Sequence, residues 1–243
     1  MYFEIPGSNV RVLGSLHMLP AGAPPLPEWV AAAYEWCEAV VHEHDNGLVG
    51  SCMRSTVPLR TVLRPSTWSA LATALPSDEA RAAFDALQPW AALISLNAGA
   101  TATQPGVEAA VLARAATDKK TLQALESADD LRRAFGAAPL AAIEDALDQM
   151  LVDLPSLQRR LEALHAAWRT GVRAAVLDAA KESAMFKSPA LHDAGLASRN
   201  RAWARQLRPM MVLPRRTLVV VGALHLCGPG NLEECLGVSF RPV

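Results

Sequence analysis

Two histidines follow two apolar runs that lie about two hundred residues apart. VRVL leads into the motif GSLH, which ends at His17, and LVVV leads into GALH, which ends at His225. Neutral imidazole is the commonest metal ligand among side chains and the usual general base near pH 7. If both runs are parallel strands of one sheet, their carboxyl ends meet at the edge where α/β folds bind ligands. We therefore predict that the two imidazoles share one site, although either histidine taken alone could be an ordinary loop or core residue.

A glycine stands at the end of each of these apolar runs. We expect Gly14 and Gly222 to let the chain leave each strand in a backbone conformation that a Cβ atom would oppose. The four cysteines, Cys37, Cys52, Cys227 and Cys235, form no CxxC pair. They are expected to be reduced and mostly buried, with Cys227 close enough to His225 to line the same pocket.

An acidic residue continues the apolar face of the segment AVVHEHD, residues 39–45. Side chains alternate along a strand, so Glu43 shares its face with valine and alanine. A carboxylate in that position must be paired, hydrogen-bonded or bound to a metal ion, because an isolated buried charge is too costly. His42 and His44 lie on the other face, and with Asp45 they are a second candidate zinc site, although their spacing is not diagnostic.

A guanidinium and an amide lie on the apolar stripe of a helix predicted over residues 197–210. Helical spacing places Arg199 and Asn200 on the same face as Trp203 and Leu207. An inward guanidinium meets either a carboxylate or the developing negative charge of a substrate. Arg199 and Asn200 are therefore candidates for a site, and an internal salt bridge is the alternative.

Two further acids are candidates for a base or a metal ligand. Glu126 ends a short strand predicted within residues 119–127, which gives it the better claim to a site. Glu108 opens a helix after Gly106, where it could equally well complement the helix dipole.

The elements that must position these residues follow an α/β pattern. The opening segment indicates two short strands around a Pro-Gly turn, and a helix is predicted from about 27 to 37. The strand at 39–45 completes a βαβ unit, which predicts that it lies beside the strand ending at Gly14. TLVVV, beginning at Thr217, is apolar throughout and is typical of a strand covered on both faces.

The middle of the chain is mostly helical, with leucine or tryptophan at spacings of three and four residues. Ser127 followed by Asp130 predicts a capped helix start. The predicted fold is α/β: a central sheet built from N- and C-terminal strands, flanked by helices, with a largely helical middle region. We expect one domain over residues 1–243, with the helical insertion over roughly 55–212.

Charge and hydropathy exclude several classes of partner. The chain has 23 basic and 24 acidic residues without a block of like charge, which argues against nucleic-acid binding. No apolar run approaches the ~18–20 residues that span a bilayer, and the start lacks the pattern of a signal peptide. We therefore expect a cytoplasmic protein with no membrane partner; the sequence does not define its oligomeric state.

Taken together, these residues resemble the TraB/GumN family, which includes the Tiki membrane-anchored proteins. Its fold is similar to that of the erythromycin esterase and ChaN haem-binding proteins. GSLH followed by MLP and GALH followed by LCGP resemble the two family signatures, and Glu43 stands where the family has an acid. The remaining resemblances are Gly106-Val107-Glu108 to a Gly-Val-Asp/Glu helix start, Leu125-Glu126-Ser127 to Leu-Glu-Thr, and Arg199-Asn200 to a late Arg-Asn pair.

The resemblance implies a metal-dependent hydrolase, because Tiki-type members are regarded as divalent-metal proteases with manganese or cobalt favoured. It implies that His17, Glu43 and His225 surround a manganese, cobalt or zinc ion. Glu126 or Glu108 would then act as base or further ligand.

Arg199 and Asn200 would hold an oxyanion or substrate, the substrate being a peptide or small molecule with an amide or ester bond. Three alternatives remain open. One is a metal-independent, esterase-like hydrolase with His17 as the base. Another is a protein that binds haem or another ligand in the same cleft without chemistry, and the last is a degenerate domain that acts through a protein partner.

Overall fold

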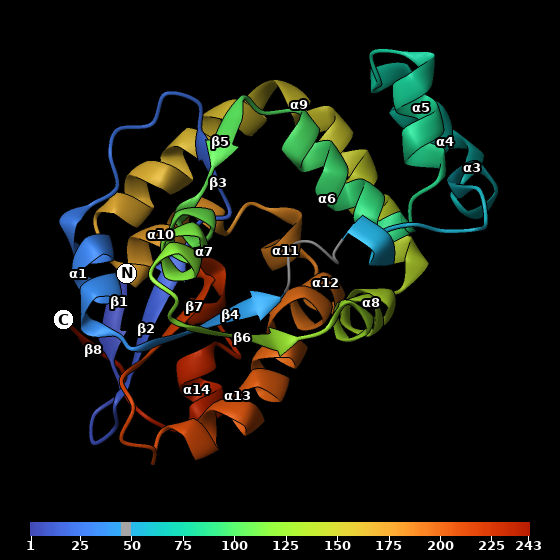
Figure 1. The fold of residues 1–243 in the computed structure, drawn as a ribbon. Helices are drawn as coiled ribbons and strands as arrows, with labels where there is room; N and C mark the ends of the chain where they lie inside the picture. Colours follow the sequence, from blue (N-terminus) through green and yellow to red (C-terminus); the bar gives the residue numbers. More distant parts are fainter. Residues whose placement is uncertain (45–49) are drawn as a thin grey trace.

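Both ends of the chain contribute to one six-stranded sheet at the centre of the molecule (Figure 1). The computed structural model describes residues 1–44 and 50–243, so Asp45 lies outside the described residues. The strands, in order across the sheet, are β6 (Thr121–Glu126), β4 (Ala39–His44), β7 (Thr217–Gly222), β2 (Val10–Ser15), β1 (Tyr2–Glu4) and β8 (Arg241–Pro242). The first four are parallel, whereas β1 and β8 are antiparallel additions. The predicted α/β sheet built from both termini is confirmed.

β7 takes the central position among the parallel strands. All six of its residues are buried, and it pairs with β2 on one side and β4 on the other. Our prediction that the strand starting at Ala39 lies beside β2 is therefore wrong. β7 occupies that place because it has no polar face that could be turned to solvent. As a result β2 and β7 end side by side, with Ser15 opposite Gly222.

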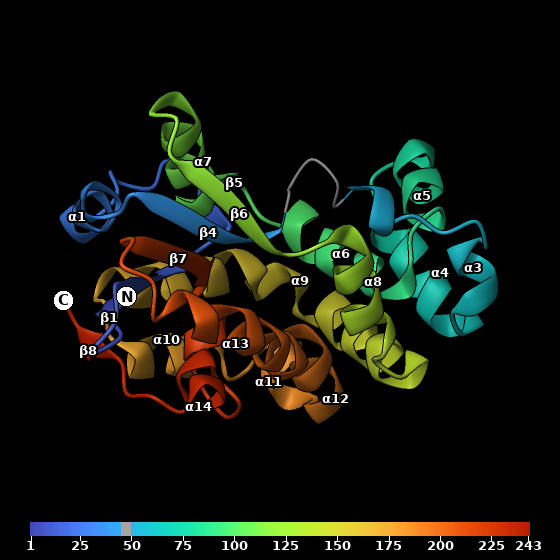
Figure 2. The ribbon, with the colours of Figure 1, turned by 60° about the horizontal axis from the view of Figure 1, so that its bottom comes forward.

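Helices cover both faces of the sheet and make up most of the middle of the chain. They are α1 (Glu28–Trp36), α3 (Leu59–Val62), α4 (Pro65–Ala74), α5 (Asp78–Asp85), α6 (Pro89–Gly99), α7 (Val107–Thr117), α8 (Ala128–Gly136), α9 (Leu140–Arg169), α10 (Arg173–Ala180), α11 (Ala184–Lys187), α12 (Pro189–His192), the π-helix η1 (Asp193–Ala197), α13 (Ser198–Met210), the 3-10 helix η2 (Ala223–Leu226) and α14 (Leu232–Leu236). Figure 2 shows α7 on one face of the sheet and α13 and α14 on the other. Within the described parts of the chain, no helix is both long and apolar enough to cross a membrane.

The long helix α9 connects the sheet to the helical arm formed by α3, α4 and α5, which projects from the rest of the molecule (Figure 1). Near its N-terminus, Ile143 and Leu147 belong to a hydrophobic cluster shared with α4 and α6. Near its C-terminus, Trp168 belongs to the cluster around the sheet, and its indole Nε1 donates a hydrogen bond of 2.7 Å to the carbonyl of Gly14. The predicted helical middle is confirmed, and this tryptophan ties it to β2.

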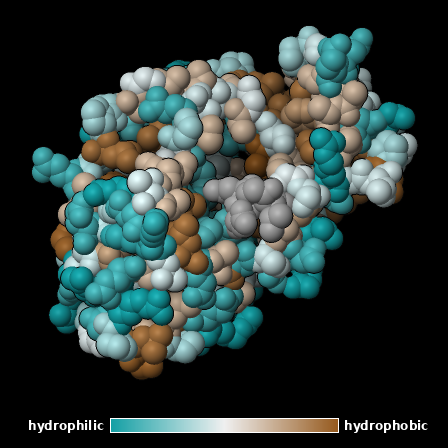
Figure 3. All heavy atoms as spheres, in the orientation of Figure 1, coloured by the Kyte–Doolittle hydropathy of each residue, from teal (hydrophilic) through white to brown (hydrophobic). Residues whose placement is uncertain are grey.

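The middle of the chain also supplies β6 and the small strand β5 (Thr103–Pro105), which pairs with β3 (Met18–Pro20). The strand predicted near Glu126 is thus confirmed. So is the helix start at Ser127, which forms a capping box with Asp130. Figure 3 shows that the molecular surface is hollowed between α7 and α6, beside the β3–β5 pair.

Gly106 presses the start of α7 against the backbone of the first histidine motif. Its amide donates to the carbonyl of His17 at 3.0 Å, and the next amide, of Val107, donates to that of Leu16 at 2.9 Å. A Cβ atom at Gly106 would lie 1.9 Å from the Leu16 carbonyl oxygen. No side chain fits there, since both neighbours are backbone.

We predict that Gly106→Ala lowers the free energy of unfolding by about 3 kcal/mol, because the clash forces α7 away from His17. Gly136→Ala is the matched control: an added Cβ meets nothing within 4 Å, so it should change stability by no more than about 1 kcal/mol. Urea denaturation of both variants measures the difference, and equal midpoints would contradict the account.

Candidate metal and acid–base site

Glu43 lies at the centre of the candidate site, where β2, β4 and β7 end together. Its side chain is 1% exposed. Oε1 accepts a hydrogen bond from the Gly222 amide at 2.5 Å, and Oε2 accepts one from Arg199 Nη2 at 2.7 Å. The Nε2 atoms of His17 and His225 lie 3.6 and 3.8 Å from Oε1. The prediction that both histidine motifs meet at a buried acid is confirmed.

Neither motif glycine adopts a positive φ, so the predicted role through backbone conformation is wrong. Both glycines instead leave room for close packing of their neighbours. A Cβ atom at Gly222 would lie 3.2 Å from Glu43 Oε1 and 3.4 Å from His17 Nε2. One at Gly14 would lie 3.0 Å from Leu226 Cδ1. A larger residue at Gly222 would therefore separate the acid from the imidazoles.

Arg199 organises the buried charges. Its Nε donates to both carboxylate oxygens of Glu126 at 3.1 Å, and its Nη2 also bonds to Glu126 and Glu43. Nη1 donates to the carbonyl of Gly195 at 3.0 Å, in the π-helix η1, and to His225 Nε2 at 3.1 Å. A guanidinium has five N–H donors, so all of them are used. No donor is left for an oxyanion or substrate, and the structure shows the internal salt bridge that was the alternative.

Asn200 fixes the ring of His225. Its Nδ2 donates to the carbonyls of His225 and Gly230 at 3.2 and 2.9 Å, which leaves Oδ1 facing His225 Nδ1 at 2.7 Å. Nδ1 must therefore carry the proton, and Nε2 accepts from Arg199. Burial lowers the pKa of His225 to about 3, and the charge of Arg199 acts in the same direction, against that of Glu43. His225 is neutral, and neither ring nitrogen offers a free lone pair.

His17 is held by a different carboxylate. Its Nδ1 donates to Oε2 of Glu108 at 2.8 Å, which turns Nε2 toward Glu43. Although desolvation lowers the pKa of His17, the charges of Glu43 and Glu108 raise it to about 9. The side chain is 48% exposed, so this imidazole is reached by solvent.

Glu108 is 2% exposed. From the sequence alone, this acid could either belong to a site or complement the dipole of its helix. The signal for a site was Gly106, two residues earlier, which brings the start of α7 onto the backbone of the histidine motif. The carboxylate then reaches the ring of His17.

His44 also reaches the site. It pairs in register with Glu126 across β4 and β6, and its ring stacks on that of His17 with centroids 6.3 Å apart. His42, by contrast, bonds through Nδ1 to the carbonyl of His44 at 3.0 Å. The predicted local pair of histidine ligands is thus divided: one ring faces the site and the other bonds to its own strand.

Two buried atoms of the site have no hydrogen-bond partner among the described residues: Nδ1 of His44 and Oε1 of Glu108. The ligand atoms of Glu43, His44 and Glu126 lie within 4.8 Å of one another. Three buried carboxylates, Glu43, Glu108 and Glu126, also outnumber the two cations that pair with them, Arg199 and His17. Buried polar atoms without partners are costly, and this donor set with its negative charge fits a metal cation.

Burial raises the pKa of Glu43, but the positive charges of Arg199 and His17 outweigh it and hold that pKa well below its ordinary value. The carboxylate is therefore ionised throughout the physiological range. An ionised carboxylate that is already oriented is ready to bind a cation.

The family model described as TraB/PrgY/gumN matches residues 3–237 of the chain. No curated protein and no solved structure matches it.

We predict that Arg199→Met lowers the free energy of unfolding by about 3–5 kcal/mol at pH 7, because two buried carboxylates lose their counter-charge. The depressed pKa of Glu43 contributes stability above its ordinary value of 4.5, which is lost as the pH falls. The deficit of the variant should therefore be full at pH 7 and should shrink only below pH 4.5, for example at pH 3. Arg201→Met, at an exposed position of the same helix, should stay within about 0.5 kcal/mol of wild type. Denaturation curves of the wild type and both variants at the two pH values measure this deficit. A deficit that does not depend on pH would contradict the assignment.

Proposed function

Because the chain belongs to the TraB/PrgY/gumN family, whose model spans residues 3–237, we propose that it is a divalent-metal-dependent hydrolase. The proposed substrate is a peptide or another small molecule with an amide or ester bond. One observation carries the proposal: a buried site holds three carboxylates against two cations, Arg199 and His17, together with two buried atoms that lack a partner among the described residues. The resemblance to Tiki-type proteases supports the same reaction class.

Glu43, His44 and Glu126 would hold the metal ion, with His17 Nε2 facing the same acid. Carboxylates with imidazole suit manganese, cobalt or zinc. A bound divalent ion lowers the pKa of water and polarises a carbonyl. His225, expected from the sequence to be a ligand, is better supported as a neutral ring that accepts from Arg199.

His17 would carry protons during the reaction. Glu108 fixes its Nδ1, so Nε2 is the nitrogen that gives or takes a proton at the Glu43 side. With a pKa of about 9, the imidazole is protonated at neutral pH and can donate to a leaving group. The same pairing of carboxylate and imidazole fixes ring orientation in many metal sites.

Arg199 and Asn200 would act as positioning residues. Arg199 holds both Glu43 and Glu126 in place, and Asn200 fixes the tautomer of His225. Neither side chain has a free donor directed at substrate, so oxyanion stabilisation would come from another group.

The second candidate is a metal-independent hydrolase in which the neutral form of His17, the minor form at neutral pH because its pKa is about 9, is the general base. The hydrogen bond of 2.8 Å between His17 and Glu108 favours this candidate. In metal-free hydrolytic sites, too, a carboxylate orients the imidazole that transfers protons. Chelation separates the two candidates.

We predict that the purified protein binds manganese, cobalt or zinc, and that it hydrolyses members of a peptide and ester library only when loaded. Glu43→Gln should weaken metal affinity at least about tenfold, because one charged ligand is lost. Glu38→Gln, an exposed acid that pairs with Arg216, is the control. Calorimetric titration and assays with and without chelator measure both effects. Hydrolysis that survives chelation would favour the second candidate, and no metal uptake with no hydrolysis would refute both.

We predict that Glu108→Gln lowers the pKa of His17 from about 9 toward its ordinary value of 6.5, because one of the two charges that raise it is removed. The stability that this group contributes is complete below pH 6.5 and is lost as the pH rises through 9, so the stability lost by the variant should be largest just below pH 6.5 and should disappear above pH 9. Asp118→Asn, which removes an acid bonded to Tyr34 at the other end of α7, is the control. NMR titration of the metal-free protein gives the pKa, and an unchanged value would contradict the role of Glu108.

A further inference from the structure

A cavity of about 530 Å³ lies between α8 and α13, at the end of β6. Two residues of the candidate site, Glu126 and Arg199, form part of its wall. Both are at least nine-tenths buried. Much of the rest of the lining is apolar: Leu125, Ala134, Ala137, Ala194, Ala202 and Trp203. The cavity therefore ends directly against the buried charges of the site.

The charged groups around this cavity are almost all paired. Glu126 bonds to Arg199, and Asp130 bonds to Arg133. Asp193 bonds to Arg201, which lies outside the lining. Arg205 is the exception: it lines the cavity and makes no hydrogen bond or ion pair with any residue in 1–44 or 50–243. The cavity thus presents one guanidinium that has no bonded partner among the described residues.

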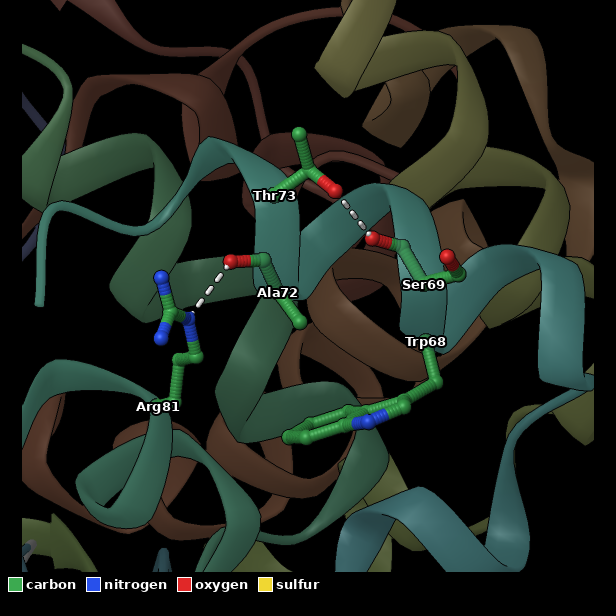
Figure 4. Close-up of a pocket in the computed structure, with 5 residues that line it drawn as sticks. All are labelled: Trp68, Ser69, Ala72, Thr73 and Arg81. Carbon is green, nitrogen blue, oxygen red and sulfur yellow. Dashed lines mark hydrogen bonds between the residues drawn. The ribbon is translucent and has the colours of Figure 1, made fainter. Parts of the chain in front are cut away.

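A second hollow, on the helical arm, differs in this respect. It is lined by Trp68, Ser69, Ala72, Thr73 and Arg81 (Figure 4). Arg81 donates from Nε to the carbonyl of Ala72 at 2.9 Å and pairs through Nη1 with Asp78. Its guanidinium is engaged by the protein itself, and the hollow lies on the arm rather than against the site.

β6 leads into the cavity along an open edge of the sheet. Among the described strands β6 is hydrogen-bonded only to β4, and its residues 121–123 are exposed. An extended peptide can add to such an edge through main-chain hydrogen bonds, with its side chains in neighbouring pockets. The end of the edge is closed by Gln206, which donates to the carbonyl of Leu125 at 2.6 Å. A peptide following the edge would therefore place its last side chain in the cavity.

We propose that the cavity between α8 and α13 binds an acidic side chain of an extended peptide, with Arg205 as its counter-charge. This proposal rests on the proposed function, because it identifies the peptide as the substrate class. A guanidinium beside an apolar wall favours a glutamate or aspartate side chain of the peptide. The carboxylate of that side chain pairs with Arg205 while its methylene groups are buried against the wall. Selection of an acidic peptide is thus a property of this surface and does not depend on which metal the site holds.

Binding of acetyl-Ala-Ala-Glu-amide and acetyl-Ala-Ala-Gln-amide to the metal-free protein tests the proposal without turnover. We expect the Glu peptide to bind about tenfold tighter than the Gln peptide at low salt, and the preference to fall as salt is added. Arg205→Gln should abolish this preference. Arg208→Gln is the matched control on the same helix, because that side chain donates to the carbonyl of Cys235 and does not line the cavity; it should keep the preference.

Equal affinity for the two peptides, no binding of either, or a preference that survives Arg205→Gln would overturn the proposal. Arg205 is exposed, so its variant is expected to fold, and circular dichroism verifies this. Hydrolysis and metal uptake are measured separately. A protein that binds metal and cleaves esters but ignores the acidic peptide would refute this inference alone, whereas peptide binding without metal uptake would refute the metal-dependent function alone.

Discussion

The structure depends on one buried guanidinium. Arg199 is surrounded by Glu43, Glu126 and His225, and it bonds to all three. Without it, two carboxylates would be buried at the ends of adjacent strands with no counter-charge, which proteins do not tolerate. With it, Glu43 stays ionised, both acids stay oriented, and the imidazole stays neutral. The same six hydrogen bonds of Arg199 that stabilise the fold therefore orient a set of ligand atoms for a cation.

The close approach of elements around this guanidinium has its own requirements. Gly222 leaves room for the carboxylate of Glu43 beside both imidazoles, and Gly106 allows α7 to lie against the backbone of His17. Trp168 holds the helical middle on β2 through the Gly14 carbonyl. These contacts join segments from the beginning, middle and end of the chain. The site is thus a product of the whole fold rather than of a local motif.

Much of this arrangement could be predicted from the sequence, because strand and helix periodicity places side chains on faces. The buried acid at Glu43, the inward Arg199 and the meeting of His17 with His225 followed from such patterns. The order of the strands did not, because pairing of β7 between β2 and β4 depends on burial of both its faces. Bond partners could not be predicted from the sequence either. That Arg199 uses every donor, and that His44 rather than His225 has a nitrogen without a partner among the described residues, depends on side-chain geometry. Glu108 was missed as a partner of His17 because only the packing of Gly106 brings it there.

The most direct test of the central claim is anomalous diffraction from crystals of the cobalt-loaded protein. The account predicts one ion bound about 2.0–2.2 Å from oxygens of Glu43 and Glu126 and from a nitrogen of His44, with Arg199 still bonded to His225. An ion held by His225 with Arg199 displaced, or an ion found only elsewhere on the molecule, would contradict it.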